Sequence, residues 1–291
     1  MLRVAFFGTD GEFSCRSLEA IATRHSVVAI VAPAAPRRRR LPALLRALLG
    51  RPAFSLSRLA RAYGALIQRA SSGGDAAARA AVLETRADVI CIAGYPWLLP
   101  ADLFRQPSLG AINLHGSLLP RHRGILPLFW IYYHDDRDTG VTVHRVTDRA
   151  DAGAILGQEA YPLPRALPVD RLNSLNAERG GALLAATLDA LDRGGVEEHP
   201  QDERLATPAP RIAPGARMVN FEDWGSERVW HFLAGLYPRF HEPLANGAGQ
   251  PVSYRGVRGF HLVSHDRASG YVEKTSHGWS LFCRDGIVEL W

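Results

Sequence analysis

Lysine is almost absent from this chain. Lys274 is the only lysine, so the other 33 of the 34 basic residues are arginine. The absence excludes a phosphate loop of the GxxxxGK(S/T) type, which needs a lysine directly after its glycine. Lysine Schiff-base chemistry would have to rest on a single residue near the C-terminus, which argues against enzymes of that class.

Cysteines and long apolar runs are also scarce. The three cysteines, Cys15, Cys91 and Cys283, are far apart and form no CxxC, which fits reduced thiols better than a disulfide framework. No apolar run reaches the ~18–20 residues that span a bilayer. The first apolar run soon meets Asp10 and Glu12, so we expect no signal peptide. Together these features predict a cytoplasmic protein without a transmembrane segment.

Acidic residues are missing from one long segment. Residues 20–74 contain no Asp or Glu but carry ten arginines, including the run Arg37–Arg40, although the net charge of the chain is only +5. Such a segment suits binding to nucleic-acid phosphates. It also fits an arginine face turned to water or to anionic lipid, so these interpretations stay open.

Apolar runs predict a parallel sheet in the first two thirds of the chain. The order strand, helix, strand at the N-terminus is typical of crossover connections in a Rossmann-like α/β fold. We expect strands at 2–7, 27–31, 88–93, 111–114, 142–146 and 155–161. We expect helices at 13–24, 41–69 with a break near Pro52, 75–86, 125–134 and 169–193.

The amino-acid composition of the chain changes near residue 200. Residues 196–216 are rich in proline, glycine and charge, which is typical of a linker. Beyond 217, short strand-like runs separated by turns suggest a small β-barrel or sandwich. The expected strands are 251–255, 258–264, 270–274, 279–283 and 286–291. We therefore predict a catalytic domain over 1–195, a linker over 196–216 and a β domain over 217–291.

The densest polar cluster follows the strand at 111–114. Strand alternation places Asn113 and His115 on one side, at a sheet edge where ligands bind in open parallel sheets. Asp151 lies in the turn before another strand, and a carboxylate beside a histidine orients it and raises its pKa. Ser117 lacks the GxSxG frame of a nucleophile, and no ligand set accompanies His115 and His122, so no metal is expected.

Two segments resemble the formyltransferase family that uses 10-formyltetrahydrofolate. They are AINLHGSLLPRHRG, at 111–124, and DTGVTVHRVTDRADAGAIL, at 138–156. The β-rich tail resembles the OB-like C-terminal domain of two branches of the family. One branch is methionyl-tRNA formyltransferase, and the other is the polymyxin-resistance enzyme that acts on UDP-4-amino-4-deoxy-arabinose. We expect the β domain of this chain to assist acceptor binding or formation of a homodimer.

The resemblance implies that Asn113, His115 and Asp151 are a catalytic trio. An amine that attacks a formyl carbon creates an oxyanion, which donors from Asn113 and protonated His115 would stabilise. Asp151 would keep His115 charged or help to remove the proton of the amine, directly or through water. The co-substrate would be 10-formyltetrahydrofolate, with no metal required.

The same resemblance indicates where the folate would bind. Residues 94–97 match the loop on the pterin side, although an aromatic plug for the core is the alternative. Arg121 and Arg123 fit either solvated loop charges or contacts to a phosphate or to the glutamate tail of folate. We therefore expect the folate site to include Tyr95, Pro96, Trp97, Leu98, Ser117, Arg121 and Gly124.

The amine acceptor is less constrained than the donor. Four sequence features are closer to the sugar-nucleotide branch than to the tRNA branch. They are INLHGSLLP, the segment ending in Trp130, His144 in TVHRV, and RADAGAI. An amino sugar on a nucleotide, or another small amine, is therefore the favoured acceptor. The arginines at 37–40 occupy the place of a basic insertion in methionyl-tRNA formyltransferases, which keeps tRNA as the alternative.

Two other classes of function stay open. The same trio passing formyl to water would give a 10-formyltetrahydrofolate deformylase. Such enzymes usually carry an N-terminal regulatory domain, for which a strand starting at Leu2 leaves no room. A non-enzymatic RNA-binding module would use the arginines, but it would not need Asn113, His115 and Asp151 together.

Overall fold

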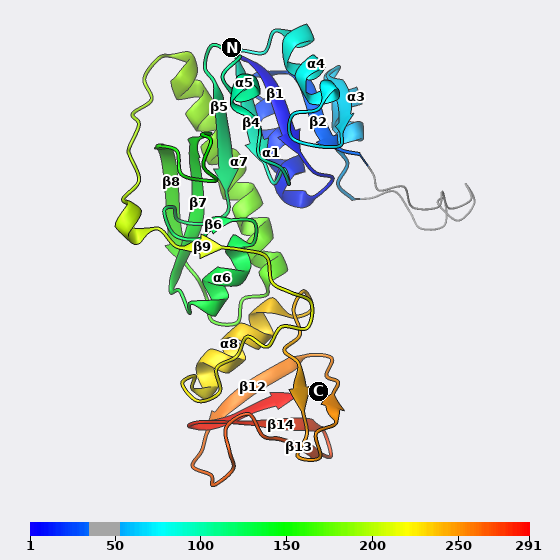
Figure 1. Cartoon of the computed structure of the whole chain (residues 1–291), viewed down its shortest axis with the longest axis vertical. Helices are drawn as coiled ribbons and strands as arrows, with labels where there is room; N and C mark the ends of the chain where they lie inside the picture. The colour runs from blue at the N-terminus through cyan, green and yellow to red at the C-terminus, as the bar shows by residue number, and fades with distance from the viewer. Residues whose placement is uncertain (35–52) are drawn as a thin grey trace, which may run out of the picture. The chain divides into compact units, whose positions relative to one another are not determined.

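The computed structural model describes residues 1–34 and 53–291. These residues form two compact units (Figure 1). The first unit contains Met1–Gly124, Gly140–Ala160 and Asn173–Pro208, and the second contains Ile125–Thr139, Tyr161–Leu172 and Ala209–Trp291. The domain boundaries at 195 and 217 stay a prediction. The run Arg37–Arg40 and the expected helical residues 41–52 lie outside the described residues.

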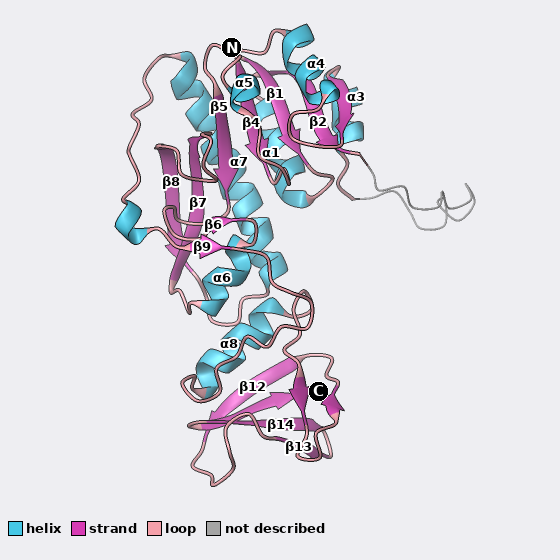
Figure 2. Ribbon diagram, in the orientation of Figure 1, coloured by secondary structure: helices cyan, strands magenta, loops and turns pink. Residues whose placement is uncertain are grey.

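A seven-stranded sheet forms the centre of the first unit. Its strand order is β3-β2-β1-β4-β5-β7-β8 (Figure 2). The first five pair in parallel, and β7 runs antiparallel to β5. The Rossmann-like sheet expected from the sequence is thus confirmed. The strands are β1 (Arg3–Gly8), β2 (Ser26–Pro33), β3 (Leu66–Ala70), β4 (Val89–Ala93), β5 (Ala111–His115), β7 (Asp138–Arg145) and β8 (Ile155–Pro162).

Helices cover both faces of this sheet. One apolar cluster joins the sheet to α1 (Glu12–Ala22), α3 (Leu56–Tyr63) and α7 (Val169–Asp192). A second cluster joins the opposite face to α4 (Ala76–Thr85) and α5 (Ala101–Phe104). Strands buried on both faces need apolar residues at every position, which explains the unbroken apolar runs of β1 and β4.

The helix expected up to residue 69 is wrong at its C-terminal end. Gly64 adopts a left-handed conformation (φ 65°) and ends α3, as glycine commonly does after a helix. Residues 66–70 then form β3, whose backbone pairs in parallel with β2. The helical spacing of leucine and arginine continues past Gly64, where the helix ends. Pairing with β2 makes Leu66–Ala70 a strand instead.

The second unit contains a helix that the sequence reading missed. The chain beyond 217 was expected to hold only strands, but Ser226–Leu236 forms α8. The buried residues Val229, Phe232, Leu233 and Leu236 follow the helical spacing i, i+3, i+4 and i+7. This periodicity was present in the sequence and was overlooked among the strand signals.

A small antiparallel sheet confirms the β character expected for the C-terminal region. Its four strands have the order β12-β15-β14-β13, and their pairings are antiparallel. An OB-like topology stays a prediction. The remaining elements are β6 (Arg123–Gly124), α6 (Pro127–Tyr133), η1 (Glu203–Leu205), β9 (Pro208–Ala209), β10 (Leu244–Ala245), β11 (Pro251–Val252), β12 (Val257–Leu262), β13 (Val272–Thr275), β14 (Gly278–Cys283) and β15 (Gly286–Leu290).

Candidate active site

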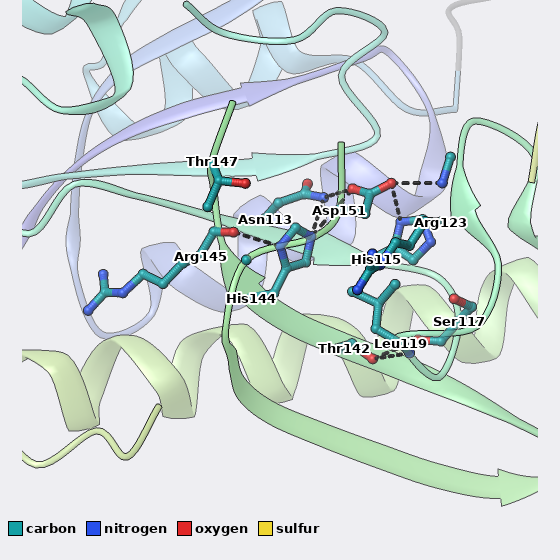
Figure 3. Close-up of polar contacts among 12 residues, drawn as sticks. Asn113, His115, Ser117, Leu119, Arg123, Thr142, His144, Arg145, Thr147 and Asp151 are labelled. Carbon is teal, nitrogen blue, oxygen red and sulfur yellow. Dashed lines mark hydrogen bonds and ion pairs between the residues drawn. The ribbon is translucent and has the colours of Figure 1, made fainter. Parts of the chain in front are cut away.

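The site forms where β5 and β7 lie side by side in antiparallel register. Asn113 pairs with His144, and His115 pairs with Thr142. Because alternate residues of a strand share a face, Asn113 and His115 point to the same side, as expected from the sequence. Figure 3 shows their side chains directed toward Asp151.

Asp151 reaches these side chains from the turn that follows β7. Its backbone is left-handed (φ 51°). Its Oδ1 accepts a hydrogen bond of 3.3 Å from Asn113 Nδ2, and its Oδ2 accepts one of 2.8 Å from the backbone N–H of Gly124. Oδ2 also lies 3.7 Å from His115 Nδ1. The structure therefore brings Asn113, His115 and Asp151 together, while their catalytic role stays a prediction.

His144 is a fourth member that the sequence analysis did not select as a site residue. Its Nδ1 lies 2.8 Å from the carbonyl oxygen of Arg145, which can only accept, so Nδ1 carries the proton. Its Nε2 therefore accepts the 3.0 Å hydrogen bond from Asn113 Nδ2. The same Nε2 lies 3.4 Å from Asp151. The signal was available, because His144 follows Thr142 at strand spacing in a segment that pairs with β5.

His115 is held by a backbone group on its other side. Its Nε2 lies 2.8 Å from the carbonyl oxygen of His122, so this nitrogen donates. With Nε2 protonated, Nδ1 is the nitrogen that faces Asp151. The imidazole is only 6% exposed, so its contacts are made in a nearly dry environment.

Burial and the neighbouring polar groups together set the charges of His115 and Asp151. Burial lowers the pKa of His115, against the opposing effect of the Asp151 carboxylate, and His144 adds to the lowering. Burial alone would raise the pKa of Asp151, but His115, His144 and the Gly124 N–H together hold it well below its usual range. Near neutral pH the site is therefore a carboxylate beside a neutral imidazole. The sequence had suggested a protonated one.

The loop after β5 is held by one internal hydrogen bond and by contacts to β7 and to Glu203. Ser117 Oγ donates to the carbonyl oxygen of Arg121 at 2.8 Å, and the Ser117 carbonyl oxygen accepts from Thr142 Oγ1 at 2.7 Å. Arg123 forms an ion pair with Glu203 at 3.0 Å, and its side chain is only 10% exposed. This pairing argues against a solvated or ligand-facing Arg123. Contacts of folate with Ser117, Arg121 and Gly124 stay predictions.

The aromatic loop after β4 combines features of both interpretations given above. The ring of Tyr95 packs edge-on against Phe7 and Trp97, with centroid separations of 5.3 and 5.4 Å. Tyr95 is thus partly a packing residue. Pro96 is exposed and Leu98 is 65% exposed, so this loop also presents apolar surface to solvent. Its contact with folate stays a prediction.

A cavity of about 320 Å³ adjoins the site at the other end of β5. Arg105, at its rim, forms an ion pair of 3.2 Å with Asp148, which lies in the segment leading to Asp151. The cavity is lined by apolar residues together with Arg105, Arg145 and Thr147. Its lining consists of Phe104, Arg105, Leu109, Gly110, Ala111, Arg145, Val146 and Thr147.

The structure describes residues 1–34 and 53–291. In these ranges no three His, Cys, Asp or Glu side chains are arranged to hold a metal ion. In the same ranges no helix is both long and apolar enough to cross a membrane.

Comparison with known proteins identifies the family. A family model described as formyl transferase matches residues 2–188, which is more than half of the chain. The chain therefore belongs to the formyl transferase family, as the motifs at 111–124 and 138–156 had indicated.

Individual relatives agree with this assignment. A methionyl-tRNA formyltransferase of Halalkalibacterium halodurans is 36% identical over 151 residues, covering 52% of this chain and 47% of that protein. One of Moorella thermoacetica is 30% identical over 239 residues, covering 81% of this chain and 74% of that protein. The matched stretch thus spans about half the length of the first relative and about three quarters of the second.

A solved structure shares the fold over the whole chain. It is the N-formyltransferase from Helicobacter canadensis, solved with folinic acid and dTDP-3-aminofucose. The TM-score is 0.70 at 15% identity, covering 100% of this chain and 98% of that one. At this identity the likeness concerns the fold alone.

Proposed function

We propose that this protein transfers the formyl group of 10-formyltetrahydrofolate to a primary amine. The observation that carries the proposal is the convergence of Asn113, His115 and Asp151 at the end of β5. The three side chains come from two segments, since Asp151 lies 38 residues from Asn113. They nevertheless share one buried site with fixed proton positions. Membership of the formyl transferase family supports the same chemistry.

Each member of the trio has a distinct part in this proposal. Asn113 Nδ2 gives up its 3.3 Å hydrogen bond to Asp151 Oδ1 and donates instead to the formyl oxygen as that oxygen becomes an oxyanion. Such a donor is worth on the order of 100–1000-fold in rate. Asp151, ionised at neutral pH, accepts the proton of the amine directly or through water. His115, neutral before the reaction, lies beside Asp151 and relays that proton to N10 of the folate, as the bond between N10 and the formyl carbon breaks and tetrahydrofolate leaves.

The folate donor is proposed to bind along β5. The cavity beside Ala111 and Thr147 suits a flat heterocycle with polar edges, because apolar residues and polar residues both line it. We propose seven further contacts of the folate, four in the loop after β4 and three in the segment after β5. They are Tyr95, Pro96, Trp97, Leu98, Ser117, Arg121 and Gly124.

We propose an amino sugar carried on a nucleotide, or another small amine, as the acceptor. The wording of the two motifs supports this choice, and His144 in TVHRV contacts Asn113 within the site. Methionyl-tRNA is the second candidate. It is favoured by the ten arginines of residues 20–74 and by relatives that carry the name methionyl-tRNA formyltransferase.

A competition assay tests both the proposed formyl transfer and the proposed acceptor. The protein and 10-formyltetrahydrofolate are offered amino-sugar nucleotides in one reaction and charged initiator methionyl-tRNA in another, with His115→Ala as the inactive control. Formylated sugar is the expected product. Formylated tRNA alone would replace the acceptor, folate release without transfer would point to a deformylase, and no turnover of any kind would contradict the proposal.

A further inference from the structure

Residues 199–207, here called the site strap, cross both segments that carry the trio. At one end, His199 exchanges two backbone hydrogen bonds, of 2.8 and 2.9 Å, with Ile155. At the other end, the carbonyl oxygen of Thr207 accepts from the backbone N–H of Arg123 at 2.8 Å. The sequence suggested a linker here, but these residues are anchored at both ends.

Gln201 connects the strap to the Asp151 turn. Its Nε2 donates to the carbonyl oxygens of Asp151 and Gly153, at 2.8 and 2.7 Å. Its Oε1 accepts from Nη2 and Nε of Arg123, at 2.8 and 3.0 Å. Both donors and both acceptor positions of the amide are thus used. One side chain therefore joins the Asp151 turn to the loop after β5.

The turn that Gln201 holds is one that would not form easily alone. Asp151 is left-handed, a conformation that side chains other than glycine adopt at a cost. Gly153 approaches the carbonyl oxygen of Arg145 so closely that a Cβ would lie 1.9 Å from it. Glu203 adds a second connection, because its carboxylate binds both Arg123 and Arg149 at 3.1 Å or less.

Thr207 connects the same strap to His115. Its Oγ1 accepts a hydrogen bond of 2.8 Å from the backbone N–H of His122. The carbonyl oxygen of His122 in turn accepts from His115 Nε2 at 2.8 Å. Two successive hydrogen bonds therefore link the strap to the imidazole, on the side opposite Asp151.

We propose that the site strap sets the geometry between His115 and Asp151, with Gln201 and Thr207 as positioning residues. Gln201 acts on the carboxylate through the Asp151 turn, and Thr207 acts on the imidazole through His122. The kinetic part of this inference rests on the proposed formyl transfer. Its structural part concerns only the placement of two side chains.

Two near-isosteric substitutions test the inference. Gln201→Glu keeps an acceptor for Arg123 but loses both donors to the turn, and Thr207→Val loses only the Oγ1 acceptor. We expect each to lower kcat by about 10–100-fold, because misplacement by about 1 Å has this effect. The KM values of both substrates should change by less than about threefold. Gln106→Glu and Thr23→Val, at exposed positions, are the matched controls and should retain full activity.

A double-mutant cycle separates positioning from general loss of structure. If Gln201 acts through Asp151, then Gln201→Glu should have no further effect on kcat in the Asp151→Asn background. Equal losses of kcat in both backgrounds would contradict the inference. So would unchanged kcat in both Gln201→Glu and Thr207→Val.

A spectroscopic measurement keeps the inference separate from the proposed function. The imidazole ¹H–¹⁵N signals of His115 and His144 are recorded at one pH in the substrate-free protein. Gln201→Glu and Thr207→Val should shift the His115 signals, whereas the two control variants should not. If the wild type transfers no formyl group to any acceptor, these spectra still test whether Gln201 and Thr207 position His115. Unshifted His115 signals would overturn the inference.

Discussion

Single atoms at the site show how burial, rather than net charge, sets its chemistry. The 3.7 Å between His115 Nδ1 and Asp151 Oδ2 would favour a charged imidazole if the pair were in water. Burial of His115 outweighs that attraction and lowers its pKa. Asp151 keeps its negative charge because the Gly124 N–H and Asn113 Nδ2 each donate a hydrogen bond to one of its oxygens. The carboxylate is therefore the group that is ready to take a proton.

The carboxylate can be removed with almost no change in shape. Asp151→Asn should fold normally and lower kcat/KM for formyl transfer by about 100–10,000-fold, the usual contribution of a general base. Steady-state kinetics and circular dichroism of the purified variant measure the two effects. Asp192→Asn, at the far end of α7, is the control. Wild-type activity in Asp151→Asn would contradict the role given to Asp151.

The charge state of His115 can be measured directly. The groups that face its ring are Asp151, His144 and His122. We expect NMR titration of the wild type to give His115 a pKa below the ordinary value of about 6.5. In Asp151→Asn the pKa should fall further, because the one charge that raises it is gone. A higher pKa in the variant would show that the carboxylate does not act on His115. The exposed His277 serves as an internal reference.

At the scale of elements, each unit depends on residues brought together from distant segments. The site needs β7 to lie against β5, since only this register places His144 opposite Asn113. In the second unit, His231 of α8 accepts a hydrogen bond of 2.8 Å from the backbone N–H of Ala166. Its ring also stacks on Tyr132, with a centroid separation of 5.0 Å.

This buried histidine predicts an acid-sensitive second unit. Burial, assisted by Arg165 and Arg137 and opposed by Asp135, lowers the pKa of His231 to about 4. The unfolded chain binds the proton more tightly, so the contribution to stability is complete above pH 6.5 and declines as the pH falls toward 4. The loss should reach about 3 kcal/mol.

Urea unfolding of wild type and His231→Phe between pH 7.5 and 4 checks this prediction. The variant lacks the acceptor for the Ala166 N–H, so we expect it to be less stable at pH 7.5 but to lose less stability on acidification. The exposed His277→Phe is the control and should retain the wild-type pH dependence. The same pH dependence in His231→Phe as in the wild type would show that this histidine is not responsible.

At the scale of the whole molecule, charge distribution bears on the choice of acceptor. The ten arginines of residues 20–74 suit a polyanion, whereas the trio needs only one amine. A protein that neutralises six to ten phosphates loses about 10³–10⁵ in affinity between 50 and 200 mM salt. A nucleotide-linked sugar offers only two phosphates. The salt dependence of acceptor binding therefore separates the two candidates.

With an amino-sugar nucleotide as acceptor, we expect its KM to rise by less than about tenfold over that range of salt. Initial rates at 50, 100 and 200 mM salt give the slope. The KM of the folate donor in the same reactions is the control, since the donor is common to both acceptor classes. A steep slope for the productive acceptor would favour recognition of tRNA through the arginine segment.

Local pattern alone determined much of this protein. The apolar runs of β1 and β4 consist of consecutive residues, and Asn113, His115 and Asp151 lie in two short motifs. The Rossmann-like sheet and the family could therefore be predicted from the sequence. The strand Leu66–Ala70 was not predicted because the helical spacing of leucine and arginine continues past Gly64. The helix α8 was not predicted because its helical spacing is short and the residues after it are strand-like.

Tertiary structure decided the features that depend on which segments become neighbours. His144 meets Asn113 only through the pairing of β5 with β7, and nothing local marks Asp151 as left-handed. Gln201 lies 50 residues from Asp151 in a segment with the composition of a linker. The burial that lowers the pKa of His115 and the neighbouring groups that lower the pKa of Asp151 are likewise properties of the packed site and not of the sequence around either residue.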